Sequence, residues 1–161
     1  MAKKQIPITL RLDDIMYDIR NKTYVVGRSK DTDENPEQVA GIQVDDEPES
    51  LNQILRSIGT AFASVRMQLS KYIDTVQSSG DNAQFEGDSD LNLVLNLPDN
   101  FDETAIDVLS SSMHNYIVNT AIAGWFSLTN QEEMEKYVEL AGSNNIQMMK
   151  ALHTRKRPER P

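Results

Sequence analysis

The alternation of hydrophobic and polar residues predicts two short strands that are far apart in the sequence. Apolar residues occupy every second position from residue 6 to residue 12 and again from 91 to 97, a period typical of half-buried strands. Pro7 cannot donate a ladder hydrogen bond, so we expect the first strand at a sheet edge, or pairing that begins after Pro7. Because an isolated strand pair is marginal in water, we expect both strands to share one small sheet packed on helices.

Apolar residues spaced three or four positions apart predict three main helices, over about 51–76, 101–127 and 130–152. A capping pair is expected at the start of each helix: Ser50 with Gln53, Asn100 with Glu103, and Thr129 with Glu132. The short connection between the second and third helices indicates neighbours that pack antiparallel or at a steep angle. The Gly-Ser-Asn-Asn stretch at 142–145 predicts a kink or break in the last helix.

The segment after the first strand has weaker signals. Residues 13–20 open with acidic side chains and carry apolar residues at helical spacing, which predicts one or two helical turns. Residues 23–27 fit a short strand or an extended arm, and the pattern does not decide between them.

Together these elements predict an α+β fold that is predominantly helical, with about three main antiparallel helices and a small β-sheet. The 161 residues favour a single domain, residues 1–161, that is long enough to bury a core. The chain has no cysteine, which excludes disulfides, thiolate metal sites and cysteine nucleophiles.

Charge is distributed unevenly along the chain. Residues 29–50 hold eight acidic residues and one lysine, and their composition predicts a mobile acidic segment, although Ile42 and Val44 could add a short contact in an assembled state. Residues 154–161 form a basic C-terminal tail. In a homo-oligomer the two segments could meet head to tail across subunits; the alternative is two solvated segments that never touch.

The formal net charge of −9 argues against general nucleic-acid binding, which needs clustered Lys and Arg. The one exception is a local contact between nucleic acid and the basic tail. No apolar run approaches the roughly 18 residues of a membrane span, and no signal peptide is recognisable. We therefore expect a soluble protein made in the cytoplasm, with no membrane partner.

No residue pattern indicates catalysis. His114 follows three serines, but Ser110 and His114 would lie along one helix face with no acidic group to orient the imidazole, so a surface or interface histidine is expected. His153, near a predicted helix end, is expected to interact with the terminal carbonyl groups rather than with a metal ion. We predict no catalytic residue.

Metal and cofactor sites are not indicated either. Residues 88–92 begin like a calcium loop, but Leu93 stands where such a loop needs glycine, and the predicted strand competes with it. Asp13, Asp14 and Asp18 could be paired carboxylates, but a solvated helix amino terminus explains them better. We predict no metal ion and no cofactor.

The candidate interaction residues are Trp125, Phe126, Arg155, Lys156 and Arg157. Trp125 is expected to plug the corner between the last two helices, whereas Phe126 is left open between the core and an exposed hot spot. The basic tail is expected to be a solvated arm, with a contact to packaged DNA or an acidic protein groove as the alternative.

Three stretches carry a resemblance to a known group of proteins. They are residues 6–12 leading into 17–24, the Trp-Phe-Ser-Leu-Thr-Asn corner at 125–130, and the terminal Arg-Lys-Arg-Pro at 155–158. In these stretches the chain resembles small structural proteins of phages and prophages of Bacteroides-type gut bacteria, from the head–tail and tail region.

The resemblance implies a non-enzymatic virion or assembly subunit, a head–tail connector or neck or tail protein. Its partners would be copies of itself and other virion proteins, and its location the host cytoplasm during assembly and then the virion. The strands and the acidic segment depart from an all-helical adaptor. The alternative function is a bacterial cytoplasmic adaptor or regulatory protein-binding module, and an enzyme is the least favoured class.

Overall fold

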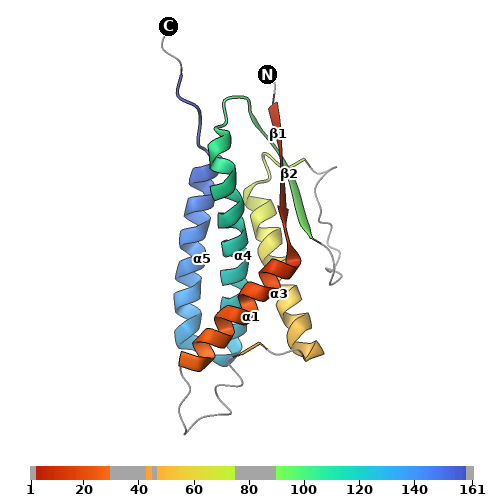
Figure 1. Cartoon of the computed structure of the whole chain (residues 1–161), viewed down its shortest axis with the longest axis vertical. Helices are drawn as coiled ribbons and strands as arrows, with labels where there is room; N and C mark the ends of the chain where they lie inside the picture. Colours follow the sequence, from red (N-terminus) through yellow and green to blue (C-terminus); the bar gives the residue numbers. More distant parts are fainter. Residues whose placement is uncertain (1–2, 30–42, 45–46, 75–89, 159–161) are drawn as a thin grey trace.

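The computed structural model describes residues 3–29, 43–44, 47–74 and 90–158. Its elements follow the order β1 (Lys3–Leu10), α1 (Leu12–Ser29), α3 (Pro48–Gln68), β2 (Leu91–Pro98), the 3-10 turn η1 (Glu103–Ala105), α4 (Ile106–Thr129) and α5 (Gln131–Leu152). The predominantly helical α+β class is confirmed, but the described residues form four α-helices rather than about three. Figure 1 shows α4 between α5 and α3, with α1 crossing the lower half and the two strands beside the upper half.

The two predicted strands form one antiparallel sheet, as expected. Register pairs Lys3 with Pro98 and Leu10 with Leu91. The alternating side chains of both strands are buried on one face: Ile6, Ile8, Leu10, Leu91, Leu93, Leu95 and Leu97. The predicted bounds of 6–12 were wrong at both ends, because pairing begins before Pro7 and Leu12 already starts α1.

Pro7 is accommodated because its missing N–H would point away from β2. Val94, its partner in the register, turns its carbonyl to the other side, where it accepts a hydrogen bond from the N–H of Asp74 at 2.9 Å. Asn96 donates its N–H in the same direction, to the carbonyl of Tyr72 at 2.6 Å. Backbone groups of directly opposed residues alternate together in an antiparallel pair, so Pro7 lies on the open side of an edge strand, as predicted.

The same contacts correct the predicted helix over 51–76. Helix α3 ends at Gln68, and the chain then turns so that Ile73 forms an isolated bridge with Leu95. Tyr72 and Ile73 continue the helical spacing of apolar residues in the sequence. Their backbone groups nevertheless pair with β2, a partner about twenty residues further along the chain that periodicity does not reveal.

Helix α1 is much longer than the one or two turns predicted for residues 13–20. It runs through residues 23–27, where the sequence left strand and extended arm open and the structure shows neither. Ile15, Ile19 and Thr23 are fully buried at four-residue spacing, so packing overrides the local preference of the β-branched residues. The hydroxyl of Thr23 accepts a hydrogen bond from the N–H of Val44, whose side chain enters the chain's own core.

All three predicted capping pairs were wrong. Helix α3 starts with Pro48 in its first turn after Glu47, which makes no side-chain cap, so Ser50 and Gln53 lie inside the helix. Asp102 caps η1 in place of Asn100. At the start of α5 the cap is Asn130, one residue after the predicted Thr129. The residue at each cap position is the one whose backbone is extended where the helix begins. Residue types alone do not specify which residue that is.

Helix α5 is continuous from Gln131 to Leu152, so no break occurs at 142–145. Ala141 and Met148 on either side of this stretch are both buried. Helix α4 packs along α5, and this apolar contact holds the weak stretch in helical form.

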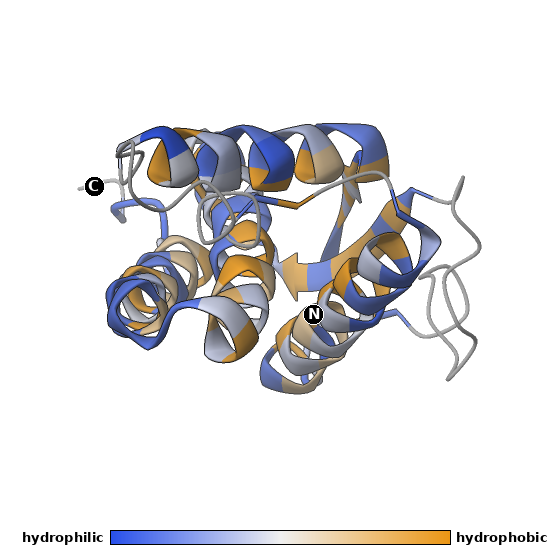
Figure 2. Ribbon diagram, turned by 90° about the horizontal axis from the view of Figure 1, so that it is seen from below, coloured by the Kyte–Doolittle hydropathy of each residue, from blue (hydrophilic) through white to orange (hydrophobic). Residues whose placement is uncertain are grey.

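The core lies where α4 faces the other helices and the sheet. Met113, Ile117, Ala121 and Ile122 of α4 are fully buried. Gly124 brings α4 close to α3, because a Cβ atom there would lie 3.3 Å from the Ser57 hydroxyl. Seen along the long axis, the hydrophobic residues turn inward between the helices and the hydrophilic ones outward (Figure 2).

Candidate interaction surface at the two ends of the molecule

The basic tail is attached to the loop that precedes η1. Phe101 and Arg155 form an isolated antiparallel bridge. The N–H of Lys156 donates to the carbonyl of Asn100 at 2.8 Å, and the N–H of Asp102 donates to the carbonyl of Thr154 at 3.2 Å. The described part of the tail, 154–158, is therefore held by backbone pairing next to the buried Phe101 rather than being a free arm.

Arg155 and His153 close the C-terminal end of α5. The Arg155 guanidinium donates through Nη1 to the carbonyls of Leu152 and Thr154, at 2.9 and 3.1 Å. The His153 Nδ1 lies 2.8 Å from the Met149 carbonyl, as expected from its position at a helix end. These contacts satisfy carbonyl groups that a helix terminus leaves without partners. Among the tail residues predicted to contact a partner, Arg155 therefore already uses its Nη1 for hydrogen bonds within its own chain.

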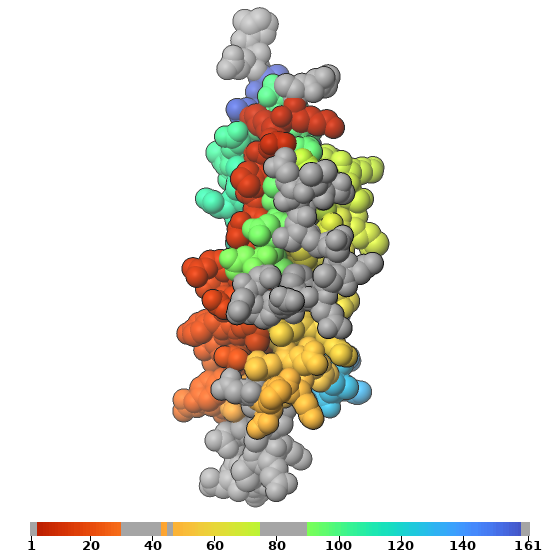
Figure 3. Space-filling model, turned by 90° about the vertical axis from the view of Figure 1, so that its right-hand side faces the viewer, coloured from red at the N-terminus to blue at the C-terminus, as the bar shows by residue number. Residues whose placement is uncertain are grey.

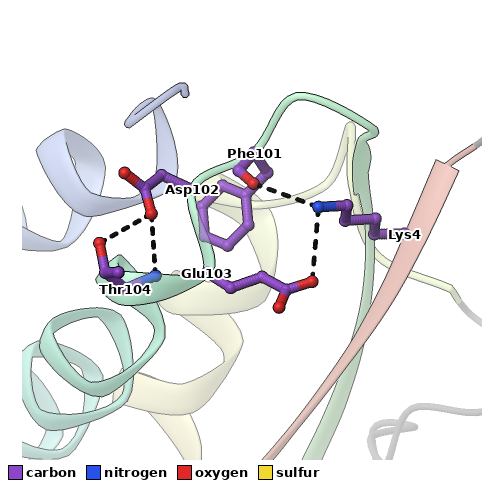
Figure 4. A network of polar contacts seen from close by, with 5 residues as sticks. All are labelled: Lys4, Phe101, Asp102, Glu103 and Thr104. Atoms are coloured by element: carbon purple, nitrogen blue, oxygen red, sulfur yellow. Dashed lines mark hydrogen bonds and ion pairs between the residues drawn. The ribbon is translucent and has the colours of Figure 1, made fainter. Parts of the chain in front are cut away.

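The amino terminus reaches the same loop. The ammonium group of Lys4 donates to the Phe101 carbonyl at 3.5 Å and forms an ion pair with Glu103 at 3.4 Å (Figure 4). Asp102, beside them, accepts hydrogen bonds from the backbone N–H and the hydroxyl of Thr104. Both chain ends and the loop at 100–104 therefore form one cluster, which we call the terminal cluster.

The pKa of Asp102 is held below its ordinary value. The largest cause is the hydrogen bond from the Thr104 hydroxyl, followed by the bond from the Thr104 N–H. The positive charges of Lys156 and Lys4 act in the same direction. Asp102 is thus a carboxylate that stabilises the start of η1, and the charges of Lys156 and Lys4 favour its ionised form.

The exposed charges at this end are mainly positive. Lys3, Lys156 and Arg157 are exposed, and so is Lys150 in the last turn of α5. Asp99, Glu103 and Asp107 are also exposed there, and Glu103 is the partner of Lys4. The ammonium and guanidinium groups suit carboxylates or other anions, through charge-assisted hydrogen bonds.

The opposite end of the long axis is acidic. Helices α3 and α5 begin there (Figure 1), and their first two turns, with the residue that precedes α3, carry exposed carboxylates: Glu47, Glu49, Glu132 and Glu135. Carboxylates are favoured at helix amino termini by the helix dipole. Glu133 is buried instead and pairs with Lys136 at 3.0 Å.

The aromatic corner lies in the core. Trp125 is 9% exposed, in agreement with its predicted role as a plug, and Phe126 is fully buried. The Phe126 ring packs on Tyr137 of α5, with 5.4 Å between ring centroids. Burial raises the pKa of Tyr137, and the nearby Glu133 adds to the shift. Neither predicted aromatic is available to a partner without rearrangement of the corner.

His114 has the acidic partner that the sequence did not show. Its Nε2 lies 2.6 Å from a carboxylate oxygen of Asp18, which is 96 residues away and belongs to α1. One helical turn further, Lys22 donates to the amide oxygen of the buried Asn119 at 3.3 Å. The two contacts join α1 to α4. The separation of 96 residues hid the Asp18–His114 pair from the sequence, which carries no local signal for it.

The carboxylates considered as metal ligands either accept hydrogen bonds within the chain or lie at the start of a helix. Asp90 accepts a hydrogen bond from the N–H of Leu12 at 3.2 Å, and Leu91 begins β2, as the strand interpretation predicted. Asp13 and Asp14 lie in the first turn of α1. Within residues 3–29, 43–44, 47–74 and 90–158 no group of three or more His, Cys, Asp or Glu is placed to hold a metal ion.

Parts of the predicted acidic segment and tail are not covered. Residues 30–42 and 45–46 of the acidic segment, residues 88–89 of the calcium-like stretch and residues 159–161 of the tail lie outside the described residues. The predicted mobility of the segment therefore stays a prediction. No helix in the described part of the chain is long and apolar enough to cross a membrane.

No protein-family model, no curated protein and no solved structure matches this chain. The resemblance to phage structural proteins therefore stays a prediction, and function is argued below from the described residues.

Proposed function

We propose that this chain is a non-enzymatic structural subunit of a phage virion, a head–tail connector or a neck or tail protein. It acts through protein–protein contacts with copies of itself and with other virion proteins. The observation that carries the proposal is the terminal cluster, in which backbone pairing at Asn100, Phe101 and Asp102 fixes the direction of the basic tail. A charged segment held in place loses less conformational entropy on binding than a free arm does.

The core supports the same function. The aromatic corner and the fully buried residues of α4 form the inside of a helical body that carries exposed charged groups at both ends. Exposed large apolar side chains are spread over all four helices: Tyr17, Tyr24 and Val25 on α1, Met67 on α3, Val108 and Leu128 on α4, and Val138, Leu140 and Ile146 on α5. Single exposed apolar residues are ordinary on monomeric surfaces, so the proposal rests on the charged ends.

The test is the protein content of purified particles. Prophages would be induced in a bacterium that encodes the chain, and density-purified virions would be analysed by quantitative mass spectrometry. We expect the protein in the particles at a fixed copy number relative to the other head–tail proteins, and in the host cytoplasm before lysis. Its absence from particles that are otherwise complete would contradict the proposal.

A pull-down from the same host separates the alternative function. A bacterial adaptor or regulatory module would capture one host protein at a defined stoichiometry. A virion subunit would instead capture itself and other virion proteins. Capture of a single host protein by the uninduced cells, together with virions that lack the chain, would favour the adaptor.

A further inference from the structure

Exposed charges of opposite sign occupy opposite ends of the molecule. The cationic end consists of the start of β1, the last turn of α5 and the tail through Arg157. The acidic end consists of the residues that open α3 and α5. Figure 1 shows these two groups of element ends at the top and bottom of the longest axis, and Figure 3 shows the same elongated outline from the side.

The two ends cannot neutralise each other within one molecule. Helix α4 runs between them, and its 24 residues span about 36 Å at 1.5 Å per residue. The Debye length is about 8 Å at physiological ionic strength, so the attraction across one molecule is screened. Contact between the ends requires a second copy.

At each end, some of the charges that oppose the prevailing sign already have partners within the chain. Glu103 at the cationic end pairs with Lys4, and Lys136 near the acidic end pairs with the buried Glu133. The guanidinium of Arg28, at the end of α1, lies 5.8 Å from the centre of the Tyr24 ring. Lys156 and Arg157 at one end and Glu132 and Glu135 at the other are exposed charges placed to face a neighbour, with Asp99 and Asp107 as exposed carboxylates at the cationic end.

We propose that the cationic end of one copy docks on the acidic end of the next copy, head to tail. Lys156 and Arg157 would lie against the carboxylates of Glu132 and Glu135. The contact uses different surfaces on the two copies, so repetition closes a ring or extends a filament, depending on the rotation between copies. This inference rests on the proposed function and names its partner and its interface.

A second copy fits these ends better than a nucleic acid does. The whole chain carries a formal net charge of −9, which opposes the approach of a polyanion. The acidic end of another copy offers carboxylates, without the charge density of a phosphate backbone. Nucleic-acid binding is therefore an outcome that the test must be able to report.

Because the chain contains no cysteine, engineered cysteines report the contact directly. The first variant carries both Arg157→Cys and Glu132→Cys, and the two matched controls carry one of these substitutions each. Under mild oxidation we expect the double variant to form a ladder of disulfide-linked species, and a mixture of the two single variants to form a linked dimer. Each single variant alone should remain largely unlinked.

Charge exchange tests the physical cause. Within the double-cysteine variant, reversal of the remaining charge at one end, by Lys156→Glu or by Glu135→Lys, should reduce cross-linking at least tenfold. The variant with both ends reversed should restore it, because the pairs are complementary again. Arg11→Glu, an exposed reversal between β1 and α1, is the matched control and should leave cross-linking unchanged. Thermal melts exclude loss of folding, and Glu135→Gln in the same double-cysteine variant provides a milder change.

Three results would overturn the inference: linked dimers from Arg157→Cys alone at the rate of the double variant, cross-linking that ignores charge reversal, or binding of a DNA duplex through Lys156 and Arg157 without self-association. The virion test is independent of these. If the protein is present in particles but does not cross-link, the proposed function stands and the head-to-tail interface is wrong. If it cross-links as expected but is absent from particles, the interface stands and the proposed function is wrong.

Discussion

Individual residues at the α4–α5 corner are where the sequence was most informative. Trp125 was predicted as a plug and is buried, while Phe126, left open by the sequence, is fully buried against Tyr137. An aromatic pair before a short connection indicates a packed corner, but it does not specify which side each ring faces. The partner of His114 could not be predicted at all, because Asp18 comes from a helix 96 residues away.

Phe126→Ala tests the corner. Removal of a fully buried aromatic side chain leaves a cavity and should lower the free energy of unfolding by about 3–5 kcal/mol. Chemical denaturation measures it, with Leu128→Ala, an exposed residue two positions away, as the control that should change stability by less than about 0.5 kcal/mol. A loss for Phe126→Ala no larger than the control's would contradict the buried position.

Asp102 gives the terminal cluster a pH dependence. Its folded-state pKa lies below the ordinary value of 3.8, so its stabilising contribution is present above that value and is lost as pH falls through the folded-state pKa. Denaturation midpoints measured from neutral pH into the acid range should therefore fall less steeply for Asp102→Asn than for the unchanged chain. Equal slopes would show that the Thr104 hydrogen bonds do not hold the carboxylate in its charged form.

At the scale of elements, periodicity located both strands and α5 to within a few residues, but it started α4 at 101 instead of Ile106 and missed the ends of α1 and α3. Helix α1 extends through residues that favour strands because Ile15, Ile19 and Thr23 pack into the core. Helix α3 stops early because Tyr72 and Asp74 bond to β2. Both errors have one physical origin: distant contacts decide the state of segments whose local signals are weak or ambiguous.

Gly142→Ala tests the continuity of α5. A Cβ atom at Gly142 would meet nothing within 4 Å, so alanine should stabilise the helix by about 0.5–1 kcal/mol. Gly124→Ala is the matched control, because its Cβ would lie 3.3 Å from the Ser57 hydroxyl and part of the gain should be lost. Destabilisation by Gly142→Ala in thermal denaturation would indicate a break in α5 after all.

The Asp18–His114 contact tests the attachment of α1 to α4. A double-mutant cycle with Asp18→Ala and His114→Ala should give a coupling energy of about 1 kcal/mol at neutral pH, the value typical of a partly buried hydrogen bond. The same cycle between Asp18 and the distant His153 is the control and should give none. Additive effects of Asp18 and His114 would mean that the contact does not stabilise the pair of helices.

At the scale of the whole molecule, the sequence showed an acidic segment and a basic tail but not where they lie. The structure holds the tail at the end where Lys4 also reaches the loop at 100–104, whereas glutamates lie at the starts of α3 and α5 at the other end. This separation comes from α3 and α5, which run in the same direction and place their acidic starts at one end, and from the last turn of α5 and the tail, which are basic at the other. The carboxylates that open α3 and α5 and the ammonium group of Lys150 near the end of α5 suit the dipoles of these helices, whereas Asp107 of α4 and Arg28 of α1 add charges of the opposite sign to the two ends.

The measurement that tests the head-to-tail account most directly is sedimentation velocity of the unchanged chain across a salt series. We predict species larger than the monomer at low ionic strength and high protein concentration. They should dissociate toward monomer near 1 M salt, where the Debye length is about 3 Å, and should be missing at every salt concentration in Lys156→Glu with Arg157→Glu. A chain that stays monomeric at low salt and high concentration, or that associates equally at all ionic strengths, would contradict it.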